Sequence, residues 1–140
     1  MKKVQFTCNC IPKGKARPRV TTVNGHSRAY TPKATVDFEK EIAAAYKKIY
    51  PEFMFSADDN LKAEIIIKMP LLKSFTKTQK QQALSGELLP AKKPDIDNIL
   101  KSIFDSLNNI CYPGDNQIIY VTAKKIYSDE PGLKITVEKI

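Results

Sequence analysis

The segment from residue 96 to residue 107 has the clearest helical periodicity in the chain. A helix with a single apolar stripe must bury that stripe against another element, so this segment predicts a helix packed on a core. The spacing of its apolar residues, at offsets 0, 3, 4, 7, 8 and 11, puts them all on one side of the helix. These residues are Ile96, Ile99, Leu100, Ile103, Phe104 and Leu107.

Six other segments have the pattern of β-strands. Most alternate apolar and polar residues, as half-buried strands do, and the one at 61–69 is expected to be central in a sheet. Asn24-Gly25 is the strongest short hairpin signal and joins two of the strands. Pro131-Gly132 marks the last turn. The predicted strands are 3–9, 19–23, 27–30, 61–69, 117–127 and 133–139.

Two further helices complete the predicted order. Thr31 and Pro32 suit the N-cap and first position of a helix that Pro51 ends, and Gly86 suits the C-cap of a polar helix over 74–85. The order β-β-β-α-β-α-α-β-β indicates an α+β fold of two layers, a mixed β-sheet with helices packed on one face. The length of 140 residues fits a single domain, 1–140.

The charge of the chain indicates a polyanionic partner. Lys and Arg total 23 against 15 Asp and Glu, which gives a formal charge of +8. No predicted helix combines a basic face with a large aromatic face, so nucleic acid is favoured over an anionic membrane, although basic proteins also exist that bind nothing charged. No apolar run approaches the roughly 20 residues of a membrane span, and the start lacks a signal peptide's apolar stretch. We therefore expect a cytoplasmic protein.

The three cysteines predict reduced thiols. An odd count in a chain without an export signal does not suggest a disulfide framework. Cys8-Asn9-Cys10 would form half of a zinc site, but by sequence the remaining ligands would have to be Cys111 and His26. We therefore interpret the pair as two small residues near the end of a strand.

Two carboxylates stand at the start of the amphipathic helix. Pro94 cannot lie inside a helix and pushes Lys93 toward an extended conformation. Asp95 is then extended as well, and Asp97 suits the N-cap of a helix that begins at Asn98. Extended residues two apart face the same side, so the two carboxylates are expected to converge at the helix N-terminus.

A lysine and a third carboxylate follow. Lys101 lies one helical turn after Asp97, and Asp115 follows the helix in a turn from which it could swing back toward the pair. Such a cluster binds Mg²⁺, which activates water and neutralises charge on a phosphate, and a nearby lysine stabilises the same charge. Each residue alone also has an ordinary structural interpretation. Asp97 would be a helix cap, Lys101 an ion-pair partner and Asp115 a turn residue.

These residues resemble the RusA family of Holliday junction resolvases. The match extends over nearly the whole chain, because the amino-terminal part is similar to the family's basic opening. The matching segments are Lys93-Pro94-Asp95-Ile96-Asp97-Asn98-Ile99-Leu100-Lys101, Phe104-Asp105-Ser106-Leu107-Asn108, Asp115-Asn116-Gln117, Pro12-Lys13-Gly14-Lys15-Ala16-Arg17-Pro18-Arg19 and Arg28-Ala29-Tyr30-Thr31-Pro32.

The resemblance implies a phosphodiester hydrolase of DNA recombination and repair. It implies a homodimer that binds four-way or other branched DNA and nicks two opposed strands, with Mg²⁺ or in its place Mn²⁺. Asp95, Asp97 and Asp115 become the metal ligands, and Lys101 becomes the catalytic lysine. Many family members have two adjacent Asp before x-Gln, whereas Gly114 precedes Asp115 here. The expected DNA contacts are Lys13, Lys15, Arg17, Arg19 and Lys93.

Two alternatives stay open at this level. One is a protein of the same fold that binds junctions without cleaving them, which the glycine at position 114 would favour. The other is a metal-dependent nuclease or phosphatase for RNA, nucleotides or other branched substrates. The chain lacks the glycine spacing of a Walker-type phosphate loop, and its single His disfavours His-based hydrolysis.

Overall fold

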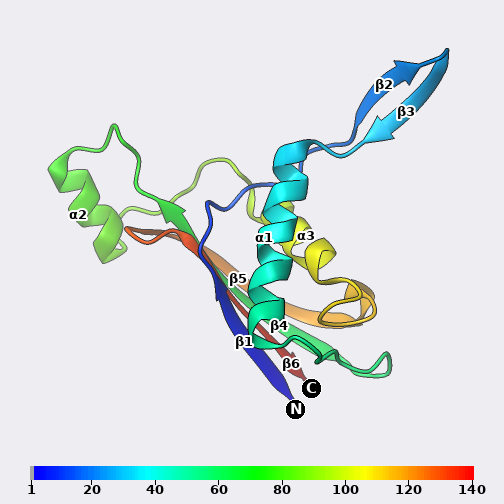
Figure 1. The fold of residues 1–140 in the computed structure, drawn as a ribbon. Coiled ribbons are helices and arrows are strands. Elements are labelled where there is room, and N and C mark those ends of the chain that lie inside the picture. Colours follow the sequence, from blue (N-terminus) through cyan, green and yellow to red (C-terminus); the bar gives the residue numbers. More distant parts are fainter. Residues whose placement is uncertain (1) are drawn as a thin grey trace.

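A computed structural model describes residues 2–140 of the chain (Figure 1), and Met1 lies outside the described residues. Strands and helices follow one another in the predicted order, with one 3-10 turn added before the last two strands. The elements are β1 (Lys3–Cys8), β2 (Arg19–Val23), β3 (His26–Tyr30), α1 (Lys33–Ile49), β4 (Leu61–Pro70), α2 (Lys77–Ser85), α3 (Ile96–Leu107), η1 (Asp115–Gln117), β5 (Ile118–Ser128) and β6 (Gly132–Lys139).

Four strands form the main sheet in the order β1-β6-β4-β5. β6 pairs antiparallel with both β1 and β4, whereas β4 and β5 are parallel, so the sheet is mixed. The strand at 61–70 is central, as its alternation predicted. Its side chains at Leu61, Ala63, Ile65 and Ile67 are buried, and the residues between them face the other side.

The helices α1 and α3 lie side by side over one face of this sheet (Figure 1). The apolar stripe of α3 is buried as predicted, with Ile99, Ile103 and Leu107 inaccessible to solvent. Phe38 and Ile42 of α1 are buried in the same core. The α+β class, with helices on one face of a mixed sheet, is therefore confirmed. No helix in residues 2–140 is long and apolar enough to cross a bilayer.

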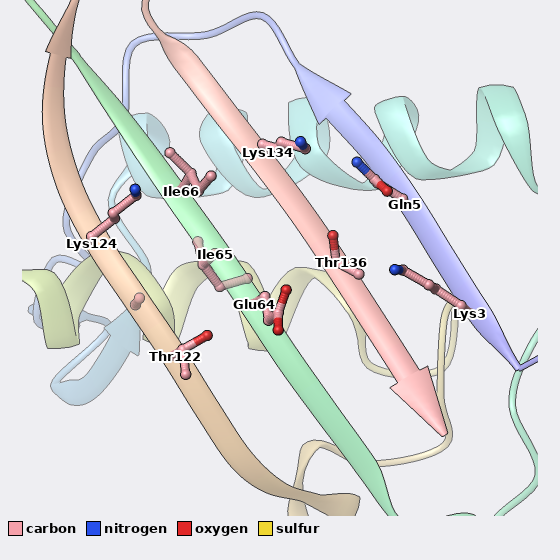
Figure 2. Close-up of a pocket in the computed structure, with 10 residues that line it drawn as sticks. Lys3, Gln5, Glu64, Ile65, Ile66, Thr122, Lys124, Lys134 and Thr136 are labelled. Carbon is pink, nitrogen blue, oxygen red and sulfur yellow. The ribbon is translucent and has the colours of Figure 1, made fainter. Parts of the chain in front are cut away.

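The other face of the sheet is open (Figure 2). Its polar and charged side chains border a shallow hollow that runs across all four strands. Lys124 of β5 points onto this open face, whereas the next residue, Lys125, belongs to the face that α3 covers. The labelled side chains on the open face are Lys3, Gln5, Glu64, Ile66, Thr122, Lys124, Lys134 and Thr136.

The hairpin β2–β3 projects from the body of the molecule (Figure 1). All its residues are exposed, and it forms a separate two-stranded sheet. Asn24 and Gly25 both have positive φ, 51° and 77°, which is the backbone of the turn that Asn-Gly predicts.

Three helix starts differ from the predictions. Pro32, not Thr31, is the N-cap of α1, because its ψ of 144° is still extended. α2 begins at Lys77, where Thr76 and Gln79 form a capping box. α3 begins at Ile96, so its N-cap is Asp95 and the prediction of Asp97 as N-cap is wrong. The extended backbone at Asp95, with ψ 146°, was expected from Pro94.

Candidate active site

Asp95 and Asp97 line one hollow of about 720 Å³ at the N-terminus of α3. Asp95 lies at the N-cap position and Asp97 in the first turn. Both are exposed, and within residues 2–140 neither carboxylate accepts a hydrogen bond or forms an ion pair; Asp95 does not cap the helix with its side chain. The positive end of the helix dipole favours negative charge here. Two carboxylates without protein partners are thus available to a ligand.

The loop that enters this site is held by a lysine from the sheet. The ammonium of Lys125 donates to the carbonyl of Lys92 at 2.7 Å and to the carbonyl of Pro94 at 2.9 Å. Lys125 lines the same hollow as the two carboxylates. No sequence motif indicated Lys125, although a lysine on the covered face of a predicted strand is a signal that could have identified it.

The basic loop between β1 and β2 packs directly on the N-terminus of α3. The backbone N–H of Lys15 donates to the carbonyl of Asn98 at 3.0 Å. A Cβ on Gly14 would lie 3.2 Å from Cβ atoms of both Pro94 and Asn98, so glycine permits the close approach. This loop and Asp95 border a second hollow, together with Lys13 and Lys93.

Lys15 connects the loop to both helices. Its ammonium pairs with Glu39 of α1 and with Asp105 of α3, the latter at 3.3 Å. Burial opposes the charged form, but the hydrogen bonds and charges of the two carboxylates outweigh it and raise the pKa of Lys15. Asp105 is therefore an ion-pair partner of the basic loop. Within residues 2–140, the side chains of Lys13, Arg17 and Arg19 form no ion pair.

Replacing Lys15 by Met should destabilise the fold. The change leaves Glu39 and Asp105, which are 22% and 32% exposed, without their shared cation. Hydrogen bonds to charged groups contribute about 1.5–3 kcal/mol, so we expect a loss of about 1–3 kcal/mol in the free energy of unfolding in urea. The matched control is Lys40→Met on the exposed face of α1, which should change it by less than about 0.5 kcal/mol. An equal effect of the two variants would contradict the bridging role.

Asp115 lies beyond the other end of α3. Its N–H donates to the side chain of Asn108, the C-cap of that helix, at 2.9 Å. Twelve helical residues rise by about 18 Å, so Asp115 is far from Asp95 within one chain. The expectation that it swings back to the first pair is not met. In residues 2–140 the three carboxylates Asp95, Asp97 and Asp115 do not form a group with ligand atoms within 4.8 Å.

The turn that carries Asp115 is nevertheless firmly held. Gln117 donates to the carbonyls of Ser56 and Asp59 and accepts the N–H of Gly114. The hydroxyl of the buried Tyr112 donates to the carbonyl of Phe104 at 2.8 Å. Burial, with the charges of neighbouring groups, raises the pKa of Tyr112 and keeps that hydroxyl a donor.

Lys101 is exposed on α3 and forms no ion pair within residues 2–140. The i,i+4 pair with Asp97, its ordinary structural alternative, is therefore not formed. Its position on the helix lies between Asp97 and the Asp115 end.

Comparisons with known proteins agree with the sequence motifs. A family model described as RusA, endodeoxyribonuclease RusA, matches residues 9–138. The chain is also similar to the protein YqaN of Bacillus subtilis (strain 168), which is described as uncharacterized. The two are 29% identical over 137 residues, a stretch that covers 98% of this chain and 96% of that protein.

Proposed function

Because this chain belongs to the RusA family of endodeoxyribonucleases, we propose that it resolves Holliday junctions by paired nicks in opposed strands, with Mg²⁺ or alternatively Mn²⁺. One observation carries this proposal. Asp95 and Asp97 are exposed and free of protein partners at a helix N-terminus, directly beside a basic loop. Metal-assisted hydrolysis of a DNA phosphodiester uses both features, an oxygen ligand set for a cation and positive charge that holds the DNA.

The two carboxylates fit a magnesium site by their chemistry. Mg²⁺ takes oxygen ligands and is commonly bound through one or two carboxylates while it keeps several waters. Asp95 and Asp97 would hold it, and Asp115 would complete the ligand set. When bound, the cation supplies positive charge that activates water and offsets charge on the phosphate. Magnesium binds through oxygen and has little affinity for thiolates, so this site is distinct from the cysteines.

The remaining residues act on the DNA. Lys101, exposed one turn after Asp97, would stabilise the charge that develops on the phosphate or the leaving oxygen. Lys93 borders both hollows around Asp95 and is proposed to contact the adjacent phosphate. Lys13, which borders the second hollow, and the exposed Arg17 and Arg19 are proposed to contact phosphates of the DNA backbone. Lys15 carries the same expectation, but its ion pairs also assign it the task of fixing the loop to α1 and α3.

The proposed homodimer has a suitable surface on β5. This strand is an edge of the main sheet, since among the described strands it pairs only with β4. Three consecutive apolar side chains on it are exposed: Ile119 by 63%, Tyr120 by 52% and Val121 by 41%. An exposed edge with apolar side chains is a template for pairing with another strand. We propose that β5 pairs antiparallel with β5 of a second copy.

This pairing would also account for the position of Asp115. A two-fold axis perpendicular to the sheet keeps both helix layers on one side and runs the two β5 strands in opposite directions. If the axis passes between Tyr120 and Val121, Ile118 at the start of one strand lies opposite Ala123 of the other, and the η1 turn before it lies opposite Lys125. Asp115 of the partner subunit then approaches the hollow that holds Asp95. Each active site would thus combine α3 of one chain with the η1 turn of the other.

Lys125 clamps the loop before α3 through its two hydrogen bonds to backbone carbonyls, and this clamp gives a prediction for activity. Lys125→Met removes both hydrogen bonds to the loop before α3, and a displacement of about 1 Å at a reacting centre can reduce a rate about 100-fold. We expect the single-turnover cleavage rate to fall by about 10–100-fold while junction affinity stays within about threefold. Lys125→Arg, which keeps donors at this position, should recover part of the rate.

Lys124→Met is the matched control for this prediction. It removes the neighbouring lysine of the same strand, but from the open face of the sheet (Figure 2). The control should cleave at the wild-type rate. Equal losses in Lys124→Met and Lys125→Met would show an effect of overall charge and not of the clamp.

The decisive experiment for the function is a cleavage assay. A labelled synthetic four-way junction is incubated with the protein with and without Mg²⁺ or Mn²⁺, beside linear duplex and RNA of the same sequence. The proposal predicts symmetric nicks in opposed strands of the junction only, and only with metal. Faster cleavage of duplex or RNA would point instead to a nuclease for another substrate.

One observation supports a second candidate, a junction-binding protein that does not cleave. Gly114 leaves the η1 turn with one carboxylate where the family commonly has two. A Cβ at this position would lie 2.6 Å from the side-chain oxygen of Asn116, a flexible group that can move. In the same assay this candidate predicts tight junction binding with no product under either metal.

A further inference from the structure

Two cysteines and a glutamate from separate parts of the chain meet at the end of β1. Cys8 is the last residue of β1, Cys10 lies in the loop that follows, and Glu41 belongs to α1. One ligand atom from each, two sulfurs and a carboxylate oxygen, lie within 4.8 Å of one another. In residues 2–140 this is the one group of three such side chains that approach so closely. None of its three residues lines the two hollows around Asp95.

We propose that Cys8, Cys10 and Glu41 bind a zinc ion. Zinc takes thiolate and carboxylate ligands in tetrahedral sites, and sulfur ligands select it over Mg²⁺ and Mn²⁺. The third ligand, Glu41, lies 31 residues after Cys10 in the sequence, so no spacing or motif indicates it. Cys111 and His26, the ligands that the sequence analysis had considered, are not in the group.

The carboxylate of Glu41 has no competing partner. Within residues 2–140 it forms neither an ion pair nor a hydrogen bond, although it lies beside two buried thiols. A hollow open to solvent adjoins the group and is lined by Cys10, Glu41 and Lys13. A water in this hollow would supply the fourth ligand of a tetrahedral ion. The hollow is also the route by which zinc would enter.

The thiol of Cys10 donates to the backbone carbonyl of Cys8 at 3.6 Å. Cys8 and Cys10 are both buried and both free. The interaction between the two side chains lowers the pKa of Cys8 and, with burial, raises the pKa of Cys10. Zinc binds thiolates and displaces the thiol protons, so its affinity should rise with pH. Two thiolates, one carboxylate and Zn²⁺ leave one negative charge, which Lys13 in the adjoining hollow is placed to offset.

The backbone around Cys8 is closely packed, which favours a preformed site. Cys8 pairs with Leu133 in the sheet, and a Cβ on the neighbouring Gly132 would lie only 2.4 Å from the carbonyl oxygen of Cys8. A zinc ion here would connect β1 to α1 at the root of the basic loop. Its ligand Glu41 lies two residues after Glu39 on α1. Glu39 pairs with Lys15, which makes the other connection between the loop and this helix.

Metal titration of the full-length chain tests the proposal without DNA. The protein is stripped with a chelator, reduced, and titrated with Co²⁺ and then with Zn²⁺ against a chromophoric competitor. We expect one ion per chain and a thiolate-to-cobalt charge-transfer band. Cys8→Ser and Cys10→Ser should each remove most of the band. Glu41→Gln should keep the band and weaken zinc binding by at least about tenfold.

Cys111→Ser is the matched control, because Cys111 is also a buried free cysteine but lies outside the group. It should leave the band and the affinity unchanged. The proposal is overturned if wild-type protein gives no thiolate band, if the band survives in both Cys8→Ser and Cys10→Ser, or if Glu41→Gln binds zinc like wild type. Glu41 is exposed, so its variant keeps the test valid even where a cysteine variant fails to fold.

Discussion

Two inactive variants, Asp95→Asn and Asp115→Asn, are expected to regain junction cleavage when they are mixed and allowed to exchange subunits. In the proposed dimer, each site takes Asp95 and Asp97 from one chain and Asp115 from the other. A dimer with one chain of each variant then contains one site that carries both changes and one site that carries neither. The intact site should nick one strand of a labelled four-way junction.

Each variant alone should be nearly inactive. Metal ions contribute several kcal/mol of transition-state stabilisation, and about 1.4 kcal/mol corresponds to a factor of ten in rate. Loss of one ligand is therefore expected to slow cleavage by at least about a hundredfold, while junction binding persists or tightens because a negative charge near the DNA is removed. Gel shifts and single-turnover cleavage of the same samples measure both quantities.

The matched control is a mixture of Asp95→Asn with Asp97→Asn. These two changes always fall in the set of ligands supplied by one α3, so no exchange of subunits rebuilds an intact site. That mixture should stay inactive. If the mixture with Asp115→Asn also stays inactive although mass spectrometry detects mixed dimers, the shared site is wrong. If single variants nick at the wild-type rate, the assignment of the ligands is wrong.

Removing the cations of the basic loop should have the second large effect, on binding and not on the chemical step. We consider the triple variant Lys13→Gln, Arg17→Gln, Arg19→Gln, whose side chains are exposed and form no ion pair within residues 2–140. Each phosphate contact releases about 0.9 of a counterion. Three lost contacts should therefore reduce the slope of the logarithm of the DNA-binding constant against the logarithm of the salt concentration by about 3. At about 0.1 M salt, affinity should fall roughly a hundredfold or more.

A variant that removes the same charge elsewhere on the protein distinguishes a general effect of net charge on DNA attraction from direct phosphate contacts by the basic loop. Lys2, Lys47 and Lys48 are exposed, and the last two lie in the last turn of α1, at the opposite end from the hairpin (Figure 1). Their replacement by Gln should change the salt slope by less than 1. Equal slopes for the two triple variants would contradict a specific role of the loop. Fluorescence anisotropy over a series of salt concentrations measures both.

Local patterns predicted nearly all elements of the fold. The stripe from Ile96 to Leu107, the alternation in β4 and the Asn24-Gly25 turn each depend on neighbours within a few residues, so periodicity and turn chemistry suffice. The N-cap of α3 was misplaced because both Asp95 and Asp97 suit a cap, and only the backbone decides between them. Asp95 takes the cap position in extended conformation, and the helix begins directly after it.

The arrangement of the candidate site was harder to predict because it depends on contacts between distant residues. Lys125 reaches Pro94 across 31 residues, since β5 runs parallel to β4 beneath the start of α3. Asp115 is separated from Asp95 by the length of α3, a separation that follows from the predicted helix but that the linear motif alone does not show. The roles of the matched residues as ligands, catalytic lysine and DNA contacts stay predictions until the variants are measured.

The exposed hairpin β2–β3 has a consequence for the thermodynamics of binding. A two-stranded ribbon without a buried face is marginally stable by itself, and every residue from Arg19 to Val23 and from His26 to Tyr30 is exposed. Its amide protons should therefore exchange with solvent faster than those of β4. If DNA immobilises the hairpin, the ordering of its backbone opposes binding by an entropy that grows with every residue fixed. Part of the electrostatic attraction of Arg19 and Arg28 would then be offset by this entropy, and slowed amide exchange in the complex would report it.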